Sequence, residues 1–431
     1  MEGMLSELDY FEPQVMQMSV VSEYDRYFNP IQTITEGGPI EFFIRGADGL
    51  YCDLNNSKIE VNVKITKETG GDLVNADSVG PVNDLLNALF MSVEMELNNV
   101  LITDPNTKYP FRAVIENLIN FNKLIFETRM LAEGWTKDTQ GQMAVTDPTG
   151  ANLGLRARTA WFTLSKGVTL IGRPHLDLFH QEKLIPAGVD MKFRFLPSKH
   201  EFLLKTVAPV GDAAQAKYKL KIVSARLFLR TKEISPSLIM AHEKMLQKTN
   251  YTISYNKVTT KTMSIPTGTS SIEFDNIYMG KLPDLLVMAM VSDADMSGGY
   301  QRNPFNFQNF GVNFMCLKAN GEQIPRIALQ PDFAGLDYIR AYFGVLESLG
   351  FDIGPNCWDI TPLEWANGYS IFAFKITAGP IGTVRTPSRV GAVRLELKFT
   401  AATTANINVL LLAQQSAEIQ VDKYKNILQI N

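Results

Sequence analysis

Apolar and polar residues alternate along much of the chain, a pattern that predicts β-strands with one buried face. Within residues 58–66, for example, the alternate positions Ile59, Val61, Val63 and Ile65 are all apolar. The same alternation recurs in five further segments, at residues 91–97, 189–195, 218–230, 393–399 and 406–413. Turns rich in Gly, Pro and Asn separate these short strands, which indicates β-sandwiches and not a parallel α/β sheet.

Three segments are predicted to be helices, and two of them have clear start signals. Residues 110–133 have helically spaced apolar positions, begin at a proline and end before Gly134. Residues 235–248 have Ser235 as N-cap, Pro236 at the first position and an apolar face. The third helix, at 337–349, stops at a glycine and is described with the repeat below.

The order of predicted elements is the same in both halves of the chain: several strands, one helix, a loop region and a closing strand pair. The Arg112-Ala113 pair and Leu118 of the first helix recur as Arg340-Ala341 and Leu346, each offset by 228 residues. The third helix also places Ile339 and Phe343 on one apolar stripe with Leu346 and ends before Gly350, a typical C′ residue. The closing pairs are offset by about 204 residues, as expected for two copies with loops of different length.

The repeat predicts an all-β fold of two tandem jelly-roll β-sandwiches, a double jelly roll, each with one helix before its last three strands. The predicted parts are an N-terminal arm at 1–30, a first jelly roll at 31–234, a linker helix at 235–249 and a second jelly roll at 250–431. The arm lacks strand alternation, so we expect it to pack poorly on its own subunit and to be ordered by a neighbour or an inner partner. The polar stretch 136–152 is predicted to be a long surface loop at the outer end.

Composition and charge narrow the function. The 431 residues are 45% hydrophobic and 20% charged, with a net charge of −4, so we expect a folded protein without sequence-specific nucleic-acid binding. Three scattered cysteines, Cys52, Cys316 and Cys357, suit a reducing compartment. Acids occupy the start of the chain and no apolar run approaches the roughly 18 residues that span a bilayer. We therefore expect neither secretion by a signal peptide nor a transmembrane segment.

Several blocks of sequence resemble one known family. Residues 36–65, 79–99 and 109–121, and the closing stretch from Arg394 to Lys423, are similar to the capsid proteins of Polinton/Maverick elements and adintoviruses. The matching blocks lie near both ends of the chain and none is a catalytic signature. The resemblance implies a double jelly-roll capsomer, a homotrimer and an icosahedral shell, with the protein located in the virion.

Jelly rolls also host metal oxygenases, so an iron site is the first enzymatic alternative. His175 and Asp177 have the His-x-Asp form that begins a facial triad, and His200 is the only reasonable third ligand. The alternative interpretation is a loop-to-strand stretch with a surface aspartate. We favour the second, because the chain shows no obvious oxoacid-binding arginine after His200.

A second alternative is a carbohydrate-binding or carbohydrate-cleaving double sandwich. Glu94 and Glu96 stand two apart on a strand, as paired carboxylates do in some glycosidases. Met91, Val93, Met95 and Leu97 take the opposite, core-facing side, so a polar outer face explains the glutamates without chemistry. The aromatic stretch 300–310 is expected to be a packed loop at a subunit contact, and the cysteines to be small buried residues.

The sequence thus predicts a major capsid protein and not an enzyme, with no catalytic, cofactor-binding or metal-binding residues. Its expected partners are two further copies in a homotrimer, neighbouring capsomers, and penton and minor capsid proteins. Two similar sandwiches in each of three chains would present six similar walls, a pseudo-hexamer that tiles a shell.

Overall fold

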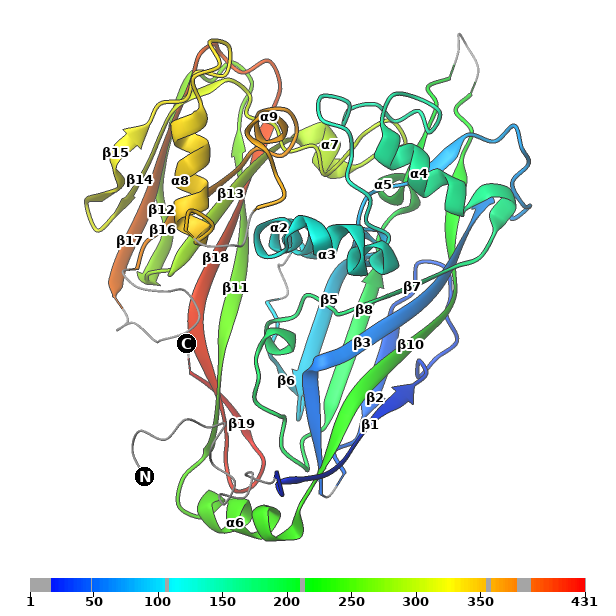
Figure 1. Cartoon of the computed structure of the whole chain (residues 1–431), viewed down its shortest axis with the longest axis vertical. Helices are drawn as coiled ribbons and strands as arrows, with labels where there is room; N and C mark the ends of the chain where they lie inside the picture. Colours follow the sequence, from blue (N-terminus) through cyan, green and yellow to red (C-terminus); the bar gives the residue numbers. More distant parts are fainter. Residues whose placement is uncertain are drawn as a thin grey trace, which may run out of the picture.

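The computed structural model describes residues 17–47, 49–104, 108–209, 214–353, 358–377 and 389–430. Most of the predicted arm and Cys357 lie outside the described residues. Two β-sandwiches stand side by side with their strands running roughly along the long axis of the molecule (Figure 1). We call them roll 1 and roll 2 in chain order.

Roll 1 is built from eight main strands. They are β1 (Val20–Phe28), β2 (Ile40–Ile44), β3 (Leu50–Lys67), β5 (Phe90–Leu97), β6 (Val100–Leu101), β7 (Val168–Gly172), β8 (Met191–Pro197) and β10 (Tyr218–Ile234). The long sheet has the order β1-β10-β3-β7 and the short sheet the order β2-β8-β5-β6. A small separate pair is formed by β4 (Val79–Pro81) and β9 (Leu204–Thr206).

Roll 2 also has eight main strands, followed by a short ninth. They are β11 (Tyr251–Ile265), β12 (Ser271–Lys281), β13 (Leu285–Ser292), β14 (Val312–Ala319), β15 (Glu322–Leu329), β16 (Ile371–Lys375), β17 (Val390–Phe399), β18 (Ile407–Val421) and β19 (Ile427–Ile430). The long sheet has the order β11-β18-β13-β16 and the short sheet the order β12-β17-β14-β15, while β19 pairs with β18.

The two rolls share one strand order. Counted along the chain, the strands of both long sheets follow the order first, eighth, third, sixth. The strands of both short sheets follow the order second, seventh, fourth, fifth. This confirms the predicted double jelly roll, in which every strand of one sheet has its counterpart in the other roll.

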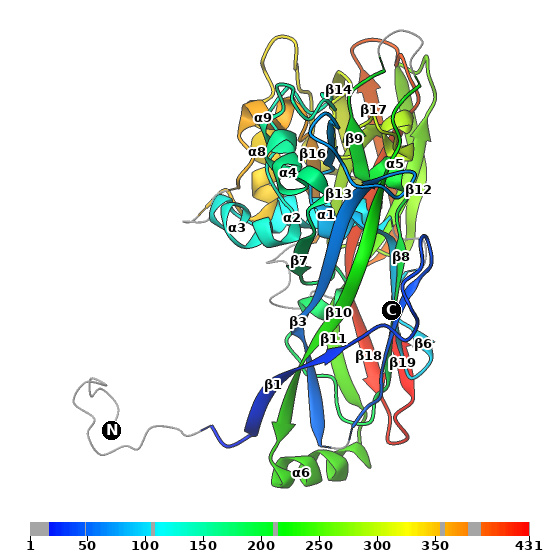
Figure 2. The same cartoon turned by 90° about the vertical axis from the view of Figure 1, so that its right-hand side faces the viewer.

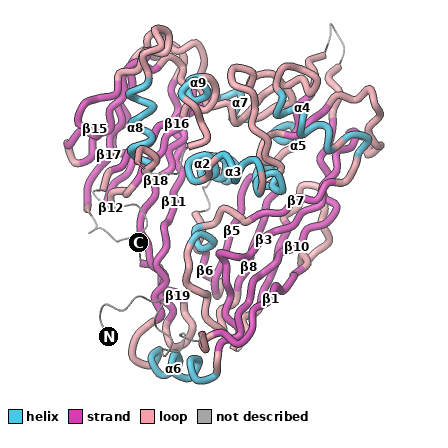
Figure 3. Tube along the Cα trace, viewed as in Figure 1, coloured by secondary structure: helices cyan, strands magenta, loops and turns pink. Residues whose placement is uncertain are grey.

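Most of the labelled helices lie in the upper half of the molecule, whereas α6 lies at the opposite end (Figures 2 and 3). The described helices of three or more residues are α1 (Leu85–Ala88), α2 (Tyr109–Asn120), α3 (Lys123–Glu127), η2 (Arg129–Glu133), α4 (Leu153–Trp161), η3 (Thr163–Ser165), η4 (Asp177–His180), α5 (His200–Leu203), α6 (Pro236–Leu246), α7 (Asp293–Ser297), α8 (Ile339–Leu349) and α9 (Pro362–Ala366). The predicted helix before the last three strands is α2 in roll 1 and α8 in roll 2. Within the described ranges, no helix has the length and apolar character needed to cross a bilayer.

The alternating apolar residues face the core as predicted, with Met91 as the exception. Ile59 and Val61 of β3 are 2% and 0% exposed. Met91, predicted to face the core, is instead 50% exposed. A bulge between Phe90 and Ser92 shifts the register of β5 against β8, so that Phe90 takes the buried place.

The structure corrects the predicted extent of the N-terminal arm. Residues 20–28 form β1, an edge strand that pairs antiparallel with β10 from Val20 opposite Ile234 to Phe28 opposite Leu227. Backbone hydrogen bonds to β10 define this strand, which needs no alternating apolar pattern because its side chains are largely exposed. Roll 1 therefore starts near Val20, and residues 1–16 lie outside the described residues.

The helix predicted at 110–133 is broken into α2, α3 and η2. Phe121 is extended and ends α2, and the Asn122 side chain then accepts a hydrogen bond from the backbone of Ile125 to start α3. Gly134 ends the segment in the left-handed conformation, with φ of 86°. The breaks fold the segment back on itself, so α2 alone runs into the space between the rolls (Figure 1).

Helix α6 joins β10 to β11 at the base of the molecule (Figure 1). Pro236 occupies its first turn as predicted. Ser235 is the N-cap as predicted, although its side chain accepts no capping hydrogen bond from the described first turn. Proline is tolerated directly after it, because the first backbone N–H groups of a helix have no helical partner.

Candidate functional site: the junction between the rolls

The two rolls are joined along a buried junction between α2 of roll 1 and the long sheet of roll 2. Strand β13 is buried on both faces because the short sheet covers one side and roll 1 covers the other. Leu285 and Val287 of β13 line a cavity of about 240 Å³ together with Glu116 and Ile119 of α2. The buried apolar residues of the two rolls therefore meet in one core region where α2 lies against β13.

Residues 136–152, predicted to be a projecting surface loop, are instead held against the protein by several buried side chains, while other residues of the stretch remain exposed. Asp138, Met143 and Asn152 are all buried. The buried polar side chains of this loop are bonded within the protein, since Asp138 accepts from Arg158 and Asn152 accepts from the backbone of Thr139. The prediction of a projecting outer loop is wrong for these residues.

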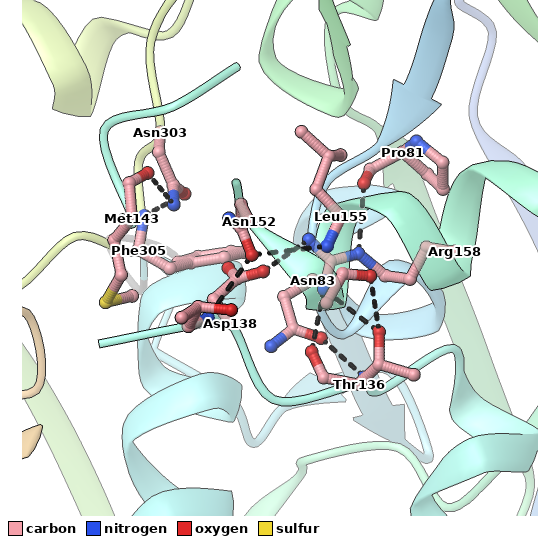
Figure 4. A network of polar contacts seen from close by, with 12 residues as sticks. Pro81, Asn83, Thr136, Asp138, Met143, Asn152, Leu155, Arg158, Asn303 and Phe305 are labelled. Carbon is pink, nitrogen blue, oxygen red and sulfur yellow. Dashed lines mark hydrogen bonds and ion pairs between the residues drawn. The ribbon is translucent and has the colours of Figure 1, made fainter. Parts of the chain in front are cut away.

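Arg158 of α4 organises this loop (Figure 4). Its Nη2 lies 2.8 Å from Asp138 Oδ1, its Nη1 donates to the carbonyl oxygen of Thr136 at 2.7 Å, and its Nε donates to the carbonyl oxygen of Pro81 at 3.1 Å. Both charged side chains are almost completely buried. Such a fully bonded arginine fixes the loop in one conformation.

The loop then reaches roll 2. The Asn303 side chain donates to the carbonyl oxygen of Met143 at 2.8 Å (Figure 4). Lys137 Nζ lies 3.1 Å from Asp359 and 3.0 Å from Glu364 of roll 2. These contacts tie the loop of roll 1 to two segments that connect strands of roll 2.

Aromatic side chains fill the junction beneath the loop. The ring of Phe305 in roll 2 lies 5.6 Å from that of Phe111 in α2 and 6.0 Å from that of Phe202 in α5. Trp358 donates its indole N–H to the carbonyl oxygen of Leu118 at 2.5 Å. The aromatic stretch 300–310 thus packs between rolls of one chain, where the sequence had predicted a contact between subunits.

A charged network lies at the wall of the junction cavity. Arg112 donates from Nε to Glu116 at 2.7 Å and from Nη2 to Asp177, and the backbone N–H of Val258 in roll 2 also donates to Asp177 at 3.2 Å. Burial alone would raise the pKa of Glu116, but Arg112 and then His175 lower it to about 2. Asp177 is buried, so the prediction of a surface aspartate is wrong.

The predicted triad of His175, Asp177 and His200 is not assembled. His200 lies beside Glu36, with 3.4 Å between Nε2 and the carboxylate oxygen, whereas Asp177 is bonded to Arg112. Among the described residues, the cluster with metal-like spacing is Glu116, His175 and His180, whose ligand atoms lie within 4.8 Å of one another.

This cluster offers the ligand atoms of a metal site, but the positive charges around it oppose a bound cation. His175 Nδ1 is 2.8 Å from Glu116, and Arg112 occupies the other carboxylate oxygen. The surrounding atoms disfavour the charged form of His180 and lower its pKa, although its ring is open to the cavity. Arg112 and Arg173 line the same cavity, and their positive charges oppose a divalent cation there.

Two further buried carboxyl groups lie behind α2. Asn87 donates from Nδ2 to Asp84 at 2.9 Å and to Glu133 at 3.3 Å. Burial, and then the nearby Asp84 carboxyl, raise the pKa of Glu133 to about 8; burial also raises the pKa of Asp84. Each group therefore holds its proton more strongly when the chain is folded.

The remaining candidates have structural roles. Glu94 lies on the outer face of the short sheet of roll 1, 3.6 Å from Arg194, which also contacts Glu41. This cation beside the carboxylates favours the polar outer face over a glycosidase pair. Cys52 and Cys316 are buried free thiols, and Cys357 lies outside the described residues.

The sequence identified His175 and Asp177 but missed their partners, which are Glu116 for His175 and Arg112 for Asp177. A signal was available: Arg112 and Glu116 stand four apart on an otherwise apolar helix, where an ion pair forms readily. Arg158 had no comparable signal, because its partners Pro81, Thr136 and Asp138 come from two segments of the chain that are both distant in sequence from Arg158.

Comparison with known proteins places this fold among virus capsid proteins. A chain of the Sputnik virophage aligns with a TM-score of 0.66 at 11% identity, covering 98% of this chain and 91% of that chain. The Faustovirus major capsid protein aligns with a TM-score of 0.62 at 8% identity, covering 98% and 92%. The mavirus major capsid protein aligns with a TM-score of 0.55 at 11% identity, covering 99% and 95%. The double jelly-roll fold of these proteins is thus shared along the whole chain.

Comparison of the sequence finds fewer similar proteins than comparison of the structure does. No protein-family model matches the chain. An uncharacterized protein of Caenorhabditis elegans is 22% identical over 352 residues, covering 79% of this chain and 80% of its own length.

Proposed function

We propose that this protein is a major capsid protein that forms homotrimeric, pseudo-hexameric capsomers of an icosahedral shell. The observation that carries the proposal is the pair of rolls with identical strand order standing side by side in one chain (Figure 1). Three such chains around an axis would present six similar sandwiches, an outline that tiles a surface without gaps. The shared fold with virus capsid proteins supports the same role.

The junction supplies what such a capsomer needs within each chain. A capsomer wall must keep its two sandwiches at one fixed angle, because neighbouring contacts depend on that angle. The ion pairs of Lys137 with Asp359 and Glu364 and the aromatic packing around Phe305 cross between the two sandwiches and hold them together here. We therefore assign the charged junction a structural role and propose that the protein is not an enzyme.

The test of the proposal is the oligomeric state of the purified chain. Mass photometry and negative-stain microscopy are expected to show trimers with a hexagonal outline, and larger arrays at high concentration. A chain that stays at its monomer mass of 48.1 kDa under all such conditions contradicts the proposal.

The same preparation tests the absence of a metal centre. We expect elemental analysis after purification without added metal to find far less than one zinc or iron per chain, because Arg112 and Arg173 oppose a cation beside Glu116. One metal per chain that disappears in His180→Ala would contradict this part of the proposal.

We further propose that the shell belongs to a DNA virus or a Polinton-like element, with neighbouring capsomers and penton and minor capsid proteins as partners. The blocks of sequence that resemble Polinton and adintovirus capsid proteins support this, and so does a relative in an animal. Sequencing the DNA around the coding region is expected to place it within a mobile or viral element. A coding region embedded among ordinary host genes, with no such element around it, would contradict the assignment.

A further inference from the structure

Helices α2 and α8 occupy equivalent places in the two rolls but differ in what covers them. Each follows the fifth main strand and precedes the sixth of its roll. Nearly every residue of α2 is buried, whereas Ile339 and Phe343 on α8 are 54% and 46% exposed. Leu336, just before α8, is 70% exposed. The predicted apolar stripe of α8 is therefore left largely without a partner among the described residues.

Helix α2, unlike α8, packs against a β-sheet of the other roll. Ile119 and Asn120 of α2 line the junction cavity opposite Val258 of β11 and Leu412 of β18. These two residues belong to the outer face of the long sheet of roll 2, which is the face turned away from the short sheet. Within the chain, the helix before the sixth strand of one roll thus packs on the long sheet of the next roll.

In the part of the chain that the structure describes, the outer face of the long sheet of roll 1 is exposed around β1 and β10. Tyr27 of β1 is 67% exposed and stands opposite the half-buried Phe228 of β10, and Val223 of β10 is 51% exposed. The face also carries the pair of Arg226 and Glu60, whose side chains remain partly exposed. Roll 1 therefore offers a sheet with apolar and charged groups at the place where roll 2 receives α2.

We infer that the apolar face of α8, formed by Leu336, Ile339 and Phe343, docks on the outer face of the roll 1 long sheet in a second copy of this chain. The inference rests on the proposed capsomer and names its contact surface. It repeats between chains the contact that α2 makes within one chain. In Figure 1, α8 lies at the front of roll 2, whereas β1, β3 and β10 belong to roll 1, so the helix and the sheet are surfaces of different rolls.

Charge complements the apolar contact. Arg340 and Glu347 are exposed on α8 and stand about two turns apart. The sheet opposite presents Glu60 and Arg226, one of each sign, so both charges of the helix find a partner of opposite sign. The contact joins two different surfaces, and such a contact closes into a ring when the rotation per chain is one third of a turn.

The first experiment places a charge on the helix face. Phe343→Asp and, separately, Ile339→Asp are expected to shift the full-length chain from trimer to the 48.1 kDa monomer in mass photometry. Ile339 is the first residue of α8, where an acid favours the helix, so the fold should survive. Met240→Asp is the matched control, because Met240 is 72% exposed on α6 at the other end of the molecule and its variant should remain trimeric.

The second experiment tests the direction of the contact. Tyr27→Asp blocks the sheet face and leaves α8 intact, whereas Phe343→Asp blocks the helix face and leaves the sheet intact. Each variant alone should be monomeric. Their mixture should form dimers and nothing larger, because one helix and one sheet remain competent to meet. A Tyr27→Asp variant that dimerises alone would indicate a helix-to-helix contact and overturn the inference.

The outcomes separate the inference from the proposed function. A wild-type trimer that both α8 variants leave intact overturns the docking surface but leaves the capsomer standing. A wild-type chain that is always monomeric overturns the capsomer and the docking surface together. Circular dichroism and thermal unfolding of each variant establish that a lost trimer is not a lost fold.

Discussion

The hydroxyl of Tyr369 in roll 2 bridges the two backbone groups of Asp138 in roll 1. The backbone N–H of Asp138 donates to it at 3.1 Å, and the hydroxyl donates to the carbonyl oxygen of Asp138 at 3.2 Å. Burial keeps the pKa of Tyr369 far above its usual range, so the phenol retains the proton that it donates. One side chain of roll 2 thus satisfies two buried backbone groups of roll 1.

Tyr369→Phe should weaken the folded chain without changing its shape. The variant leaves a buried N–H and a buried carbonyl unpaired, at a cost of about 1–3 kcal/mol for each group. Urea unfolding followed by fluorescence measures the change. Tyr424→Phe, at an exposed position, is the control and should be close to neutral. Equal stabilities of the two variants would mean that other groups replace the bridging hydroxyl.

Arg158→Met should destabilise the chain more strongly than Tyr369→Phe does. The change removes the partner of a buried carboxylate, and breaking a buried ion pair from one side costs roughly 3–5 kcal/mol. Adding Asp138→Asn to the same chain should recover part of this loss, because the uncompensated charge is gone. A double variant as unstable as the single one would show that Arg158 acts through Thr136 and Pro81 instead.

The strands could be predicted from sequence because each obeys a local rule. In β3 the alternating residues fix which face is buried, whatever the rest of the chain does. The rule failed at Met91, where a bulge inverts the pattern, and at β1, whose pairing with β10 depends on backbone bonds. Neither event leaves a mark in the hydropathy of the segment itself.

The junction was harder to predict because its partners are distant in sequence. Asp138 and Tyr369 are 231 residues apart, and nothing near either position indicates the other. A polar, aperiodic stretch such as 136–152 is typical of a surface loop. Asp138 and Met143 of this stretch nevertheless bond to residues of the second roll. His180 lies only five residues after His175, yet η4 brings the centroid of its ring to 5.5 Å from that of His175.

Stability should fall between acid and mildly alkaline pH because of Glu133. Its pKa is about 8 in the folded chain and near 4.5 when unfolded, so between these values the folded chain holds a proton that the unfolded chain has released. The free energy of unfolding therefore decreases as pH rises through this window, by at most about 1.4 kcal/mol per pH unit. Urea unfolding at pH 5.5 and pH 8.5 measures the decrease.

Glu133→Gln should make that decrease smaller, because the side chain no longer titrates. Asp84 retains a raised pKa and should leave a residual slope. Glu364→Gln is the control, because the pKa of Glu364 is lowered and its removal cannot flatten this window. If wild type and Glu133→Gln lose the same free energy between the two pH values, the carboxyl of Glu133 is ionised in the folded chain.

Phe305→Ala should show that the two rolls unfold as one unit. Phe305 belongs to roll 2 but packs against Phe111 and Phe202 of roll 1, so its removal opens a cavity at the junction and costs about 3–5 kcal/mol. Phe43→Ala, at a position 48% exposed on β2, removes the same ring from the surface and should cost less than about 1 kcal/mol. If the junction is part of one cooperative core, unfolding of Phe305→Ala followed by denaturant keeps a single transition at a lower midpoint, with the slope of the wild type. Two separate transitions in the wild-type chain would contradict this, because each roll would then be stable without the other.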